Sequence, residues 1–167
     1  MKKLILLTGA MGVGKTTVGQ KLCDALGRAA FIDGDWCLDI HPFVGNRETK
    51  DMAVRNIVFM IRNYAACSEC DSIVLSWVMS ENTVGTILSA LADVDLCIEN
   101  ITLTCNEAAL TARWHADTLT PWRSDEELAN SLCSLPDYSS RGKTWLLDAS
   151  DRTADDVVAE ILAKIRG

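Results

Sequence analysis

The chain has 167 residues, the length of one ordinary domain, so a second full domain is not expected. With 49% hydrophobic and 23% charged residues and only 3 prolines, the composition is that of a globular protein. Sixteen basic and 23 acidic residues leave a net charge of −7, without a cluster of Lys and Arg. A broad nucleic-acid surface needs such a cluster and is therefore disfavoured, whereas a small local anion site is not.

The cysteines and the apolar runs predict the compartment. Seven cysteines, an odd number, lie mostly in apolar or helical stretches, which is typical of a reducing compartment. The first apolar run, residues 4–7, is shorter than the roughly 7–15 residues of a signal-peptide core. No stretch approaches the ~20 apolar residues of a membrane span. We expect a cytoplasmic monomer or homodimer without membrane contact.

Short apolar runs alternate with longer stretches of helical periodicity along the chain. Strands are predicted, in chain order, over residues 4–7, 29–32, 73–78, 96–104 and 144–147. Helices are predicted over residues 15–26, 49–66, 81–91, 107–115, 125–132 and 153–165, the fifth of them started by a capping box of Ser124 and Glu127. This alternation predicts an α/β fold, a parallel sheet with helices on both faces.

The segment Gly9–Thr16 carries the most specific motif of the chain. It matches G-x-x-x-x-G-K-[ST] at every fixed position, between a predicted strand and a predicted helix. Glycines let the backbone wrap a phosphate, and the amides of the first helical turn point at it. The motif predicts that Lys15 reaches the β- and γ-phosphates, that Thr16 binds Mg²⁺ and that Thr17 contacts the α-phosphate. The predicted nucleotide-binding residues of this loop are Gly9, Ala10, Met11, Gly12, Val13, Gly14, Lys15, Thr16 and Thr17.

Two carboxylates, Asp33 and Asp35, end the second predicted strand. Ligands of open α/β sheets bind at the carboxyl ends of the strands, so both residues are expected beside the phosphate loop. Because they are two residues apart, they point the same way on an extended chain. One can orient a Mg²⁺-bound water while the other positions or deprotonates an attacking hydroxyl. The alternative is a plain turn, since Asp-Gly-Asp is common in turns; the preceding phosphate loop favours the site.

With these two motifs the chain resembles the small P-loop kinases of the nucleoside monophosphate kinase-like fold. Gly34-Asp35, His41-Pro42 and Asn46 resemble gluconate kinases, although extra residues precede the histidine. Asp33 and Asp35 match the D-x-D of shikimate kinases and the start of the D-G-D-N of adenylylsulfate kinases, with Trp36 in place of Asn. The chain is also similar to bacterial proteins described as nucleotide kinases, and the resemblance spans nearly all 167 residues.

The resemblance implies a single P-loop kinase domain over residues 1–167. Its five-stranded parallel sheet would have the order 2-3-1-4-5 in a three-layer sandwich. Residues 36–71 would form the acceptor-binding insert, and residues 116–124 would form the lid.

The resemblance also implies residue roles. Asp35 would contact the substrate hydroxyl, and Asp33 would lie near Mg²⁺. Arg113 would lie near adenine or phosphate, and Arg123, the one lid arginine that matches, would neutralise the transferring phosphoryl group. For each arginine a solvated surface role is the alternative.

The predicted function is ATP- and Mg²⁺-dependent transfer of the γ-phosphoryl group to a small molecule. The acceptor would be a sugar acid, another hydroxyl metabolite or a nucleotide, and Lys15, Asp33, Asp35 and Arg123 would carry the catalysis. The alternative is a P-loop NTPase or nucleotide-dependent switch that acts with a protein partner. The connection over residues 34–71 favours the kinase, because it exceeds the dozen or so residues of a minimal crossover.

Overall fold

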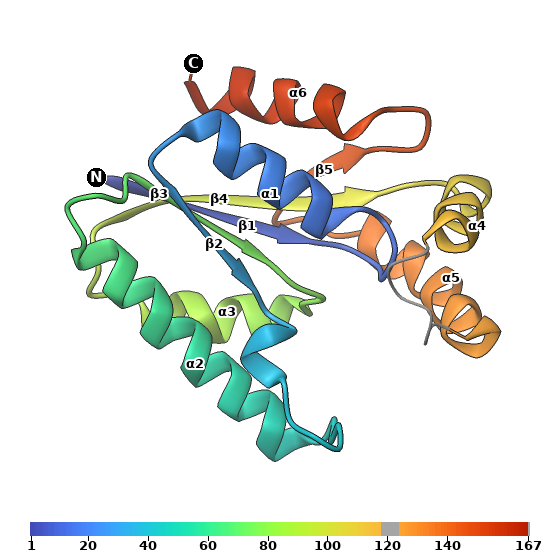
Figure 1. The fold of residues 1–167 in the computed structure, drawn as a ribbon, viewed down its shortest axis with the longest axis horizontal. Helices are drawn as coiled ribbons and strands as arrows, with labels where there is room; N and C mark the ends of the chain where they lie inside the picture. Colours follow the sequence, from blue (N-terminus) through green and yellow to red (C-terminus); the bar gives the residue numbers. More distant parts are fainter. Residues whose placement is uncertain (118–123, 167) are drawn as a thin grey trace.

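The computed structural model describes residues 1–117 and 124–166. Figure 1 shows one twisted parallel sheet with helices on both faces. Its strands are β1 (Lys2–Thr8), β2 (Ala29–Asp33), β3 (Ser72–Ser76), β4 (Leu96–Thr104) and β5 (Trp145–Asp148). All paired strands run parallel, and the strand order is β2-β3-β1-β4-β5, which confirms the predicted fold class and order.

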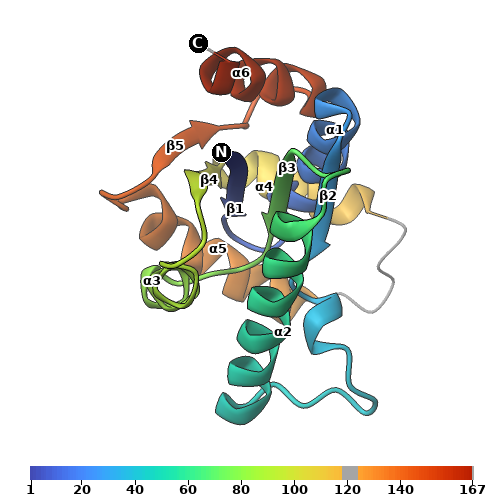
Figure 2. The same cartoon turned by 90° about the vertical axis from the view of Figure 1, so that its left-hand side faces the viewer.

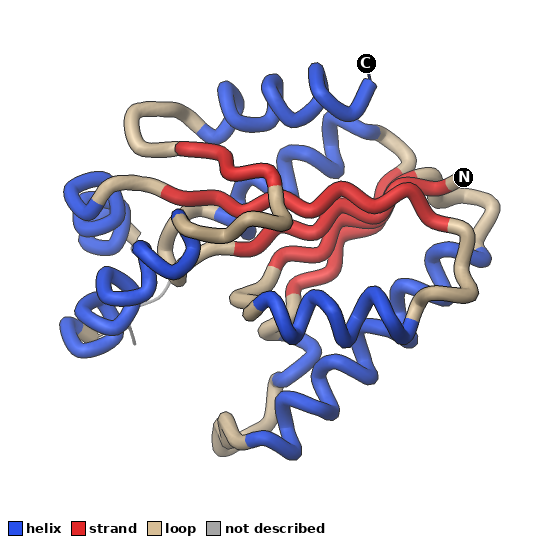
Figure 3. The backbone as a smooth tube through the Cα atoms, turned by 180° about the vertical axis from the view of Figure 1, so that it is seen from behind, coloured by secondary structure: helices blue, strands red, loops and turns tan. Residues whose placement is uncertain are grey.

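The helices divide into two covering layers and a pair at the carboxyl edge of the sheet (Figures 1 and 3). They are α1 (Lys15–Leu26), the 3₁₀ turn η1 (Trp36–Leu38), α2 (Arg47–Ala66), α3 (Glu81–Ala90), α4 (Glu107–Ala116), α5 (Asp125–Ser139) and α6 (Ala154–Arg166). One face is covered by α1 and α6 and the other by α2 and α3, while α4 and α5 lie beyond the ends of the strands.

The central strand β1 is buried on both faces, as its continuous apolar run predicts. Leu4 and Leu6 pack into the core under α2 and α3, whereas Ile5 and Leu7 pack into the core under α1 and α6. All four side chains are fully buried. The two cores therefore hold the start of the phosphate loop, directly after β1, in a fixed place.

Strand register brings the two predicted motifs to the same edge. Asp33, the last residue of β2, is paired with Ser76 of β3, and Ser76 is paired with Leu7 of β1. The chain reaches Gly9 two residues later, so the phosphate loop and the Asp33–Asp35 segment leave the sheet side by side.

Several predicted boundaries differ from the structure, most of them by one or two residues, and three of these differences have a physical reason in the structure. Strand β3 ends at Ser76, not residue 78, because the backbone turns there and leaves Val78 43% exposed. Helix α5 continues to Ser139, through Pro136, because Leu135 and Tyr138 bury on the core. Helix α2 starts at Arg47 rather than 49, since Asn46 and Thr49 form an unpredicted capping box.

The predicted lid, residues 116–124, lies mostly outside the described residues. Ala116 is the last residue of α4 and Ser124 is the N-cap of α5; residues 118–123, including Arg123, are not described. Within the described part of the chain, no helix is both long enough and apolar enough to cross a membrane.

Candidate active site

The phosphate loop has the backbone conformation that only glycine adopts without strain. Gly9, Gly12 and Gly14 have φ values of 146°, 81° and 105°, and Gly14 is the N-cap of α1. A Cβ on Gly9 would lie 2.3 Å from the carbonyl oxygen of Leu103, in the neighbouring strand β4. The loop can therefore lie this close to the sheet only with glycine at position 9.

Helices α4 and α5 brace the outer side of the loop. Arg113 of α4 donates hydrogen bonds to the carbonyl of Val13 at 3.2 Å and to the carbonyl of Ala149, after β5. Ser131 of α5 donates to the carbonyl of Met11 at 2.6 Å. These bonds occupy carbonyl oxygens of the loop and leave its amides for an anion, in keeping with phosphate binding.

The two candidate Mg²⁺ ligands, Thr16 and Asp33, meet between β2 and α1. Thr16, in the first turn of α1, donates its hydroxyl hydrogen to Asp33 Oδ2 at 3.2 Å. Lys15 is buried, and its ammonium donates to the carbonyl of Ala10 at 2.8 Å, so it lies over the loop. The hydrogen bond from Thr16 to Asp33 thus links the phosphate-loop motif to the acidic motif.

Asp35 lies in a turn and not on an extended strand, so the expectation that an extended chain directs it the same way as Asp33 was wrong. Its backbone has φ −67° and ψ −35°, and it is the N-cap of η1. Its amide donates to Asp33 Oδ1 at 3.0 Å, which joins the two acidic residues. Asp35 nevertheless lies beside Asp33, as the motif predicted.

Trp77 orients the Asp35 carboxylate. Its indole Nε1–H donates to Asp35 Oδ1 at 3.0 Å, while its own amide donates to the carbonyl of Leu7 at 3.1 Å. The indole packs against the backbone of Gly34, where a Cβ would lie 2.1 Å from Trp77 Cγ. Gly34 is therefore required by a close approach, because its φ is not in the left-handed region.

The pKa of Asp33 is raised above its ordinary value, mainly because burial disfavours the charged form. The Asp35 carboxylate raises this pKa further, whereas the hydrogen bonds from the Asp35 amide and from Thr16, together with the charge of Lys15, lower it. A partly desolvated carboxylate next to a hydroxyl is a suitable partner for a hard cation, which would offset the unfavourable charge.

The donor set fits Mg²⁺ bound together with a nucleotide. Among residues 1–117 and 124–166, no group of three or more His, Cys, Asp or Glu side chains is placed to hold a metal ion. Thr16 and Asp33 alone offer two oxygens, and Mg²⁺ in phosphoryl-transfer sites is typically held by one or two side chains, water and the phosphates. A site that needs the nucleotide to be complete agrees with this arrangement.

The structure brings together the loop Gly9–Thr17, Asp33 and Asp35, and it adds Arg113 on the outer side of the loop. The sequence patterns identified neither Trp77 as the residue that orients Asp35 nor Ser131 as a support of the loop. No local pattern marks Ser131, a single serine inside a helix. No local pattern marks the contact between Trp77 and Gly34 either, because the two residues are 43 positions apart in the sequence.

These features define a nucleotide-binding protein with the fold of the small P-loop kinases. The chain belongs to the AAA domain family, whose model matches residues 5–130. The resemblance to the small P-loop kinases is confirmed. No curated protein matches the chain.

Solved structures share the fold over nearly the whole chain. A gluconokinase from Sinorhizobium meliloti is 20% identical, with a TM-score of 0.73 and coverage of 98% of this chain and 91% of its own. The Mycobacterium tuberculosis APS kinase, in complex with AMPPNP and APS, is 15% identical, with a TM-score of 0.69 and coverage of 99% and 98%. A shikimate kinase from Bacteroides thetaiotaomicron is 19% identical, with a TM-score of 0.63 and coverage of 99% of each chain.

Proposed function

We propose that the chain is an ATP- and Mg²⁺-dependent phosphotransferase that moves the γ-phosphoryl group to a small-molecule acceptor. The observation that carries this proposal is the pair of neighbouring acidic residues beside the phosphate loop, in which the Asp35 amide donates to the Asp33 carboxylate. Asp33 is bonded to Thr16 of the loop helix, and Asp35 is held toward the neighbouring β3 edge by Trp77. A nucleotide site and an oriented second carboxylate thus share one edge of the sheet.

On the nucleotide side, the amides of Gly9–Thr17 would bind the phosphates, and Lys15 would pair with the β- and γ-oxygens. Thr16 and Asp33 would hold Mg²⁺, which supplies positive charge near the bridging oxygens. Arg113 would keep the loop and the segment after β5 at a fixed separation, because it is bonded to both. That segment would lie beside the adenine.

On the acceptor side, Asp35 would accept a hydrogen bond from the attacking hydroxyl or take up its proton. The acceptor oxygen forms a new bond to the γ-phosphorus, and the bond between that phosphorus and the β,γ-bridging oxygen breaks. ADP leaves with both electrons of that bond, and the hydroxyl proton is released. In the insert, residues 36–71, η1 and α2 lie next to Asp35 and would surround the acceptor.

The comparisons support the proposed class of acceptor. The structures with the same fold include a gluconokinase, a shikimate kinase and an APS kinase, whose names give three hydroxyl-bearing acceptors. A sugar acid, another hydroxyl metabolite or a nucleotide is the corresponding acceptor for this chain. We further propose a single domain over residues 1–167, with a lid over residues 116–124 that contributes Arg123. A reducing, cytoplasmic location suits the 7 free cysteines.

Release of ADP from ATP and Mg²⁺, measured with and without a panel of sugar acids, nucleosides and nucleoside monophosphates, tests this function. One class of acceptor is expected to raise the rate well above the acceptor-free rate. Asp35→Asn should abolish transfer and leave ATP affinity unchanged, whereas Asp95→Asn, at the opposite edge of the sheet, should leave both unchanged. ADP release that no acceptor raises but a protein partner does would instead show the alternative, a nucleotide-dependent switch.

A further inference from the structure

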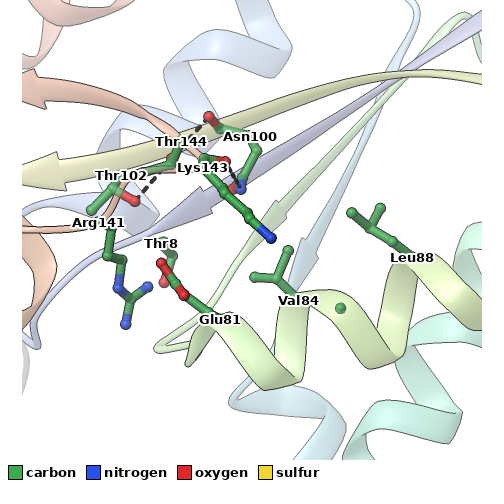
Figure 4. Close-up of a pocket in the computed structure, with 10 residues that line it drawn as sticks. Thr8, Glu81, Val84, Leu88, Asn100, Thr102, Arg141, Lys143 and Thr144 are labelled. Atoms are coloured by element: carbon green, nitrogen blue, oxygen red, sulfur yellow. Dashed lines mark hydrogen bonds between the residues drawn. The ribbon is translucent and has the colours of Figure 1, made fainter.

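A second polar cavity lies on the face of the sheet that carries α3, away from the Asp33–Asp35 pair. Its volume is about 230 Å³, and it is bounded by α3, by β4 and by residues 141–144 before β5 (Figure 4). Asn100 and Thr102 follow Ile98 at two-residue spacing along β4 and therefore share its face. Ile98 is 38% exposed and Leu146 of β5 is 39% exposed; among the described helices, α2 and α3 lie on this face (Figure 2) and leave both side chains partly open to solvent.

The cavity contains polar groups that the protein itself does not satisfy. The buried Oδ1 of Asn100 has no hydrogen-bond partner, although its Nδ2 donates to the carbonyl of Lys143 at 3.0 Å. The Nδ2 bond fixes the orientation of the amide, because the flipped amide would place two oxygens together. Within the described part of the chain, no interaction pairs the Lys143 ammonium or the Glu81 carboxylate. Buried polar groups in native proteins normally have partners, so an unpaired oxygen here points to a ligand.

The charges specify the ligand further. Two cations, Lys143 and Arg141, and one carboxylate, Glu81, line the cavity, which is a local positive excess in a chain of net charge −7. Val84 and Leu88 of α3 form an apolar wall. The volume of about 230 Å³ lies below the roughly 300–1,000 Å³ of pockets that hold drug-sized ligands, so the cavity suits a small metabolite.

We propose that this cavity binds a small carboxylic acid that carries an amino or hydroxyl group next to its carboxylate. The carboxylate pairs with Lys143 and Arg141, and the adjacent N–H or O–H donor satisfies Asn100 Oδ1 and Glu81. An apolar part of the ligand lies along Val84 and Leu88. Amino acids and 2-hydroxy acids are the two sources of this chemistry.

The cavity is connected to the nucleotide site by hydrogen bonds. Arg141 donates to the carbonyl of Met79 at 2.8 Å, and Thr8, the residue before the phosphate loop, donates to the same carbonyl at 3.2 Å. The Met79 amide donates back to Thr8 Oγ1 at 3.0 Å. Met79 follows Trp77 by two residues, so Arg141, which pairs with the ligand, contacts the segment whose Trp77 orients Asp35. The ligand is therefore expected to alter the turnover of the proposed kinase, an effect that rests on the proposed function.

Calorimetric titration of the full chain without nucleotide tests the binding. Glycine, L-leucine, L-lactate and inorganic phosphate are the probes, and at least one carboxylate is expected to bind with a millimolar dissociation constant. Lys143→Ala should weaken that binding about tenfold, the effect of one charge-assisted contact. The control Lys164→Ala removes an equal charge from α6, on the other face, and should leave it unchanged. Absence of carboxylate binding, or equal binding by the Lys143→Ala variant, overturns the site.

Two further arms separate the sources. Glu81→Gln, in the exposed first turn of α3, should weaken an amino acid far more than lactate, because an ammonium forms an ion pair with the carboxylate, whereas a hydroxyl can also donate its hydrogen bond to the glutamine oxygen. If only phosphate binds, and Lys15→Ala removes that binding while Lys143→Ala does not, the anion lies in the phosphate loop and the proposal is wrong.

Coupling is measured on ADP release at saturating ATP, where the bound carboxylate should change kcat about fivefold in the wild type and not in the Lys143→Ala variant. Binding without a change in kcat supports the site and overturns its coupling to the phosphate loop. Because the titrations contain no ATP, failure of the site and failure of the proposed kinase activity are distinguishable.

Discussion

Replacing Trp77 by phenylalanine should slow phosphoryl transfer without weakening ATP binding. The indole Nε1–H is the side-chain donor to Asp35 Oδ1, at 3.0 Å, and phenylalanine keeps an aromatic ring against Gly34 while removing that donor. A hydrogen bond to a charged group contributes about 1.5–3 kcal/mol. Because Asp35 is exposed and water can replace part of the bond, the lower end applies, ~1.5 kcal/mol. We therefore expect kcat to fall about tenfold.

The assay is ADP release at saturating ATP and acceptor, followed by the KM for ATP. Trp77 contacts Asp35, on the acceptor side of the proposed site, so the KM for ATP should stay within about twofold of the wild-type value. The smaller ring also leaves a space in the core that should lower the free energy of unfolding by about 1–2 kcal/mol, measured by urea denaturation. Trp145→Phe is the matched control, since it removes the same groups from β5, and it should leave kcat unchanged. A wild-type kcat for Trp77→Phe, or a loss seen only through the KM for ATP, would refute the orienting role.

Three more substitutions test the rest of the site. Gly34→Ala places a Cβ 2.1 Å from Trp77 Cγ and should lower the free energy of unfolding by about 1–3 kcal/mol in urea denaturation. Combining it with Trp77→Ala should recover most of the loss caused by the added Cβ. If the effects of the two substitutions on the free energy of unfolding simply add, the close contact is contradicted. Asp33→Asn should weaken the binding of Mg²⁺ and ATP about 10- to 100-fold in calorimetry. The same variant should unfold at a higher temperature than the wild type at pH 7, because the raised folded-state pKa of Asp33 makes its ionised form destabilising. This gain in unfolding temperature should vanish as the pH falls below about 4, where Asp33 is protonated in both the folded and the unfolded state. A gain that persists below this pH would point to another cause. Ser131→Ala removes the 2.6 Å bond to Met11 and should cost about 1 kcal/mol of stability, with weaker ATP binding; unchanged ATP affinity would show that α5 does not hold the loop.

Local motifs predicted the parts of the site that are close in sequence. The phosphate loop, its flanking strand and helix, and the Asp33–Asp35 pair lie within the first 35 residues. Strand alternation placed both motifs at one edge, because parallel strands end together.

The contacts that complete the site join distant segments and have no local pattern. The Trp77–Asp35 bond spans 42 residues and the Ser131–Met11 bond spans 120. Helix α5 passes through Pro136, beyond its predicted end at residue 132, because burial of Leu135 and Tyr138 outweighs the hydrogen bond that proline cannot donate. Tertiary packing, and not propensity, decided these features.

The close packing of Gly34 and Trp77 has a consequence for how this protein can change over time. A side chain at position 34 is incompatible with an indole at position 77, so neither position can vary first without a loss of packing or of Asp35 orientation. Homologues that carry a larger residue after the first aspartate should have a smaller one at the end of β3, with another donor for the second aspartate. Positions 34 and 77 should therefore vary as a pair, although they are 43 positions apart in the sequence.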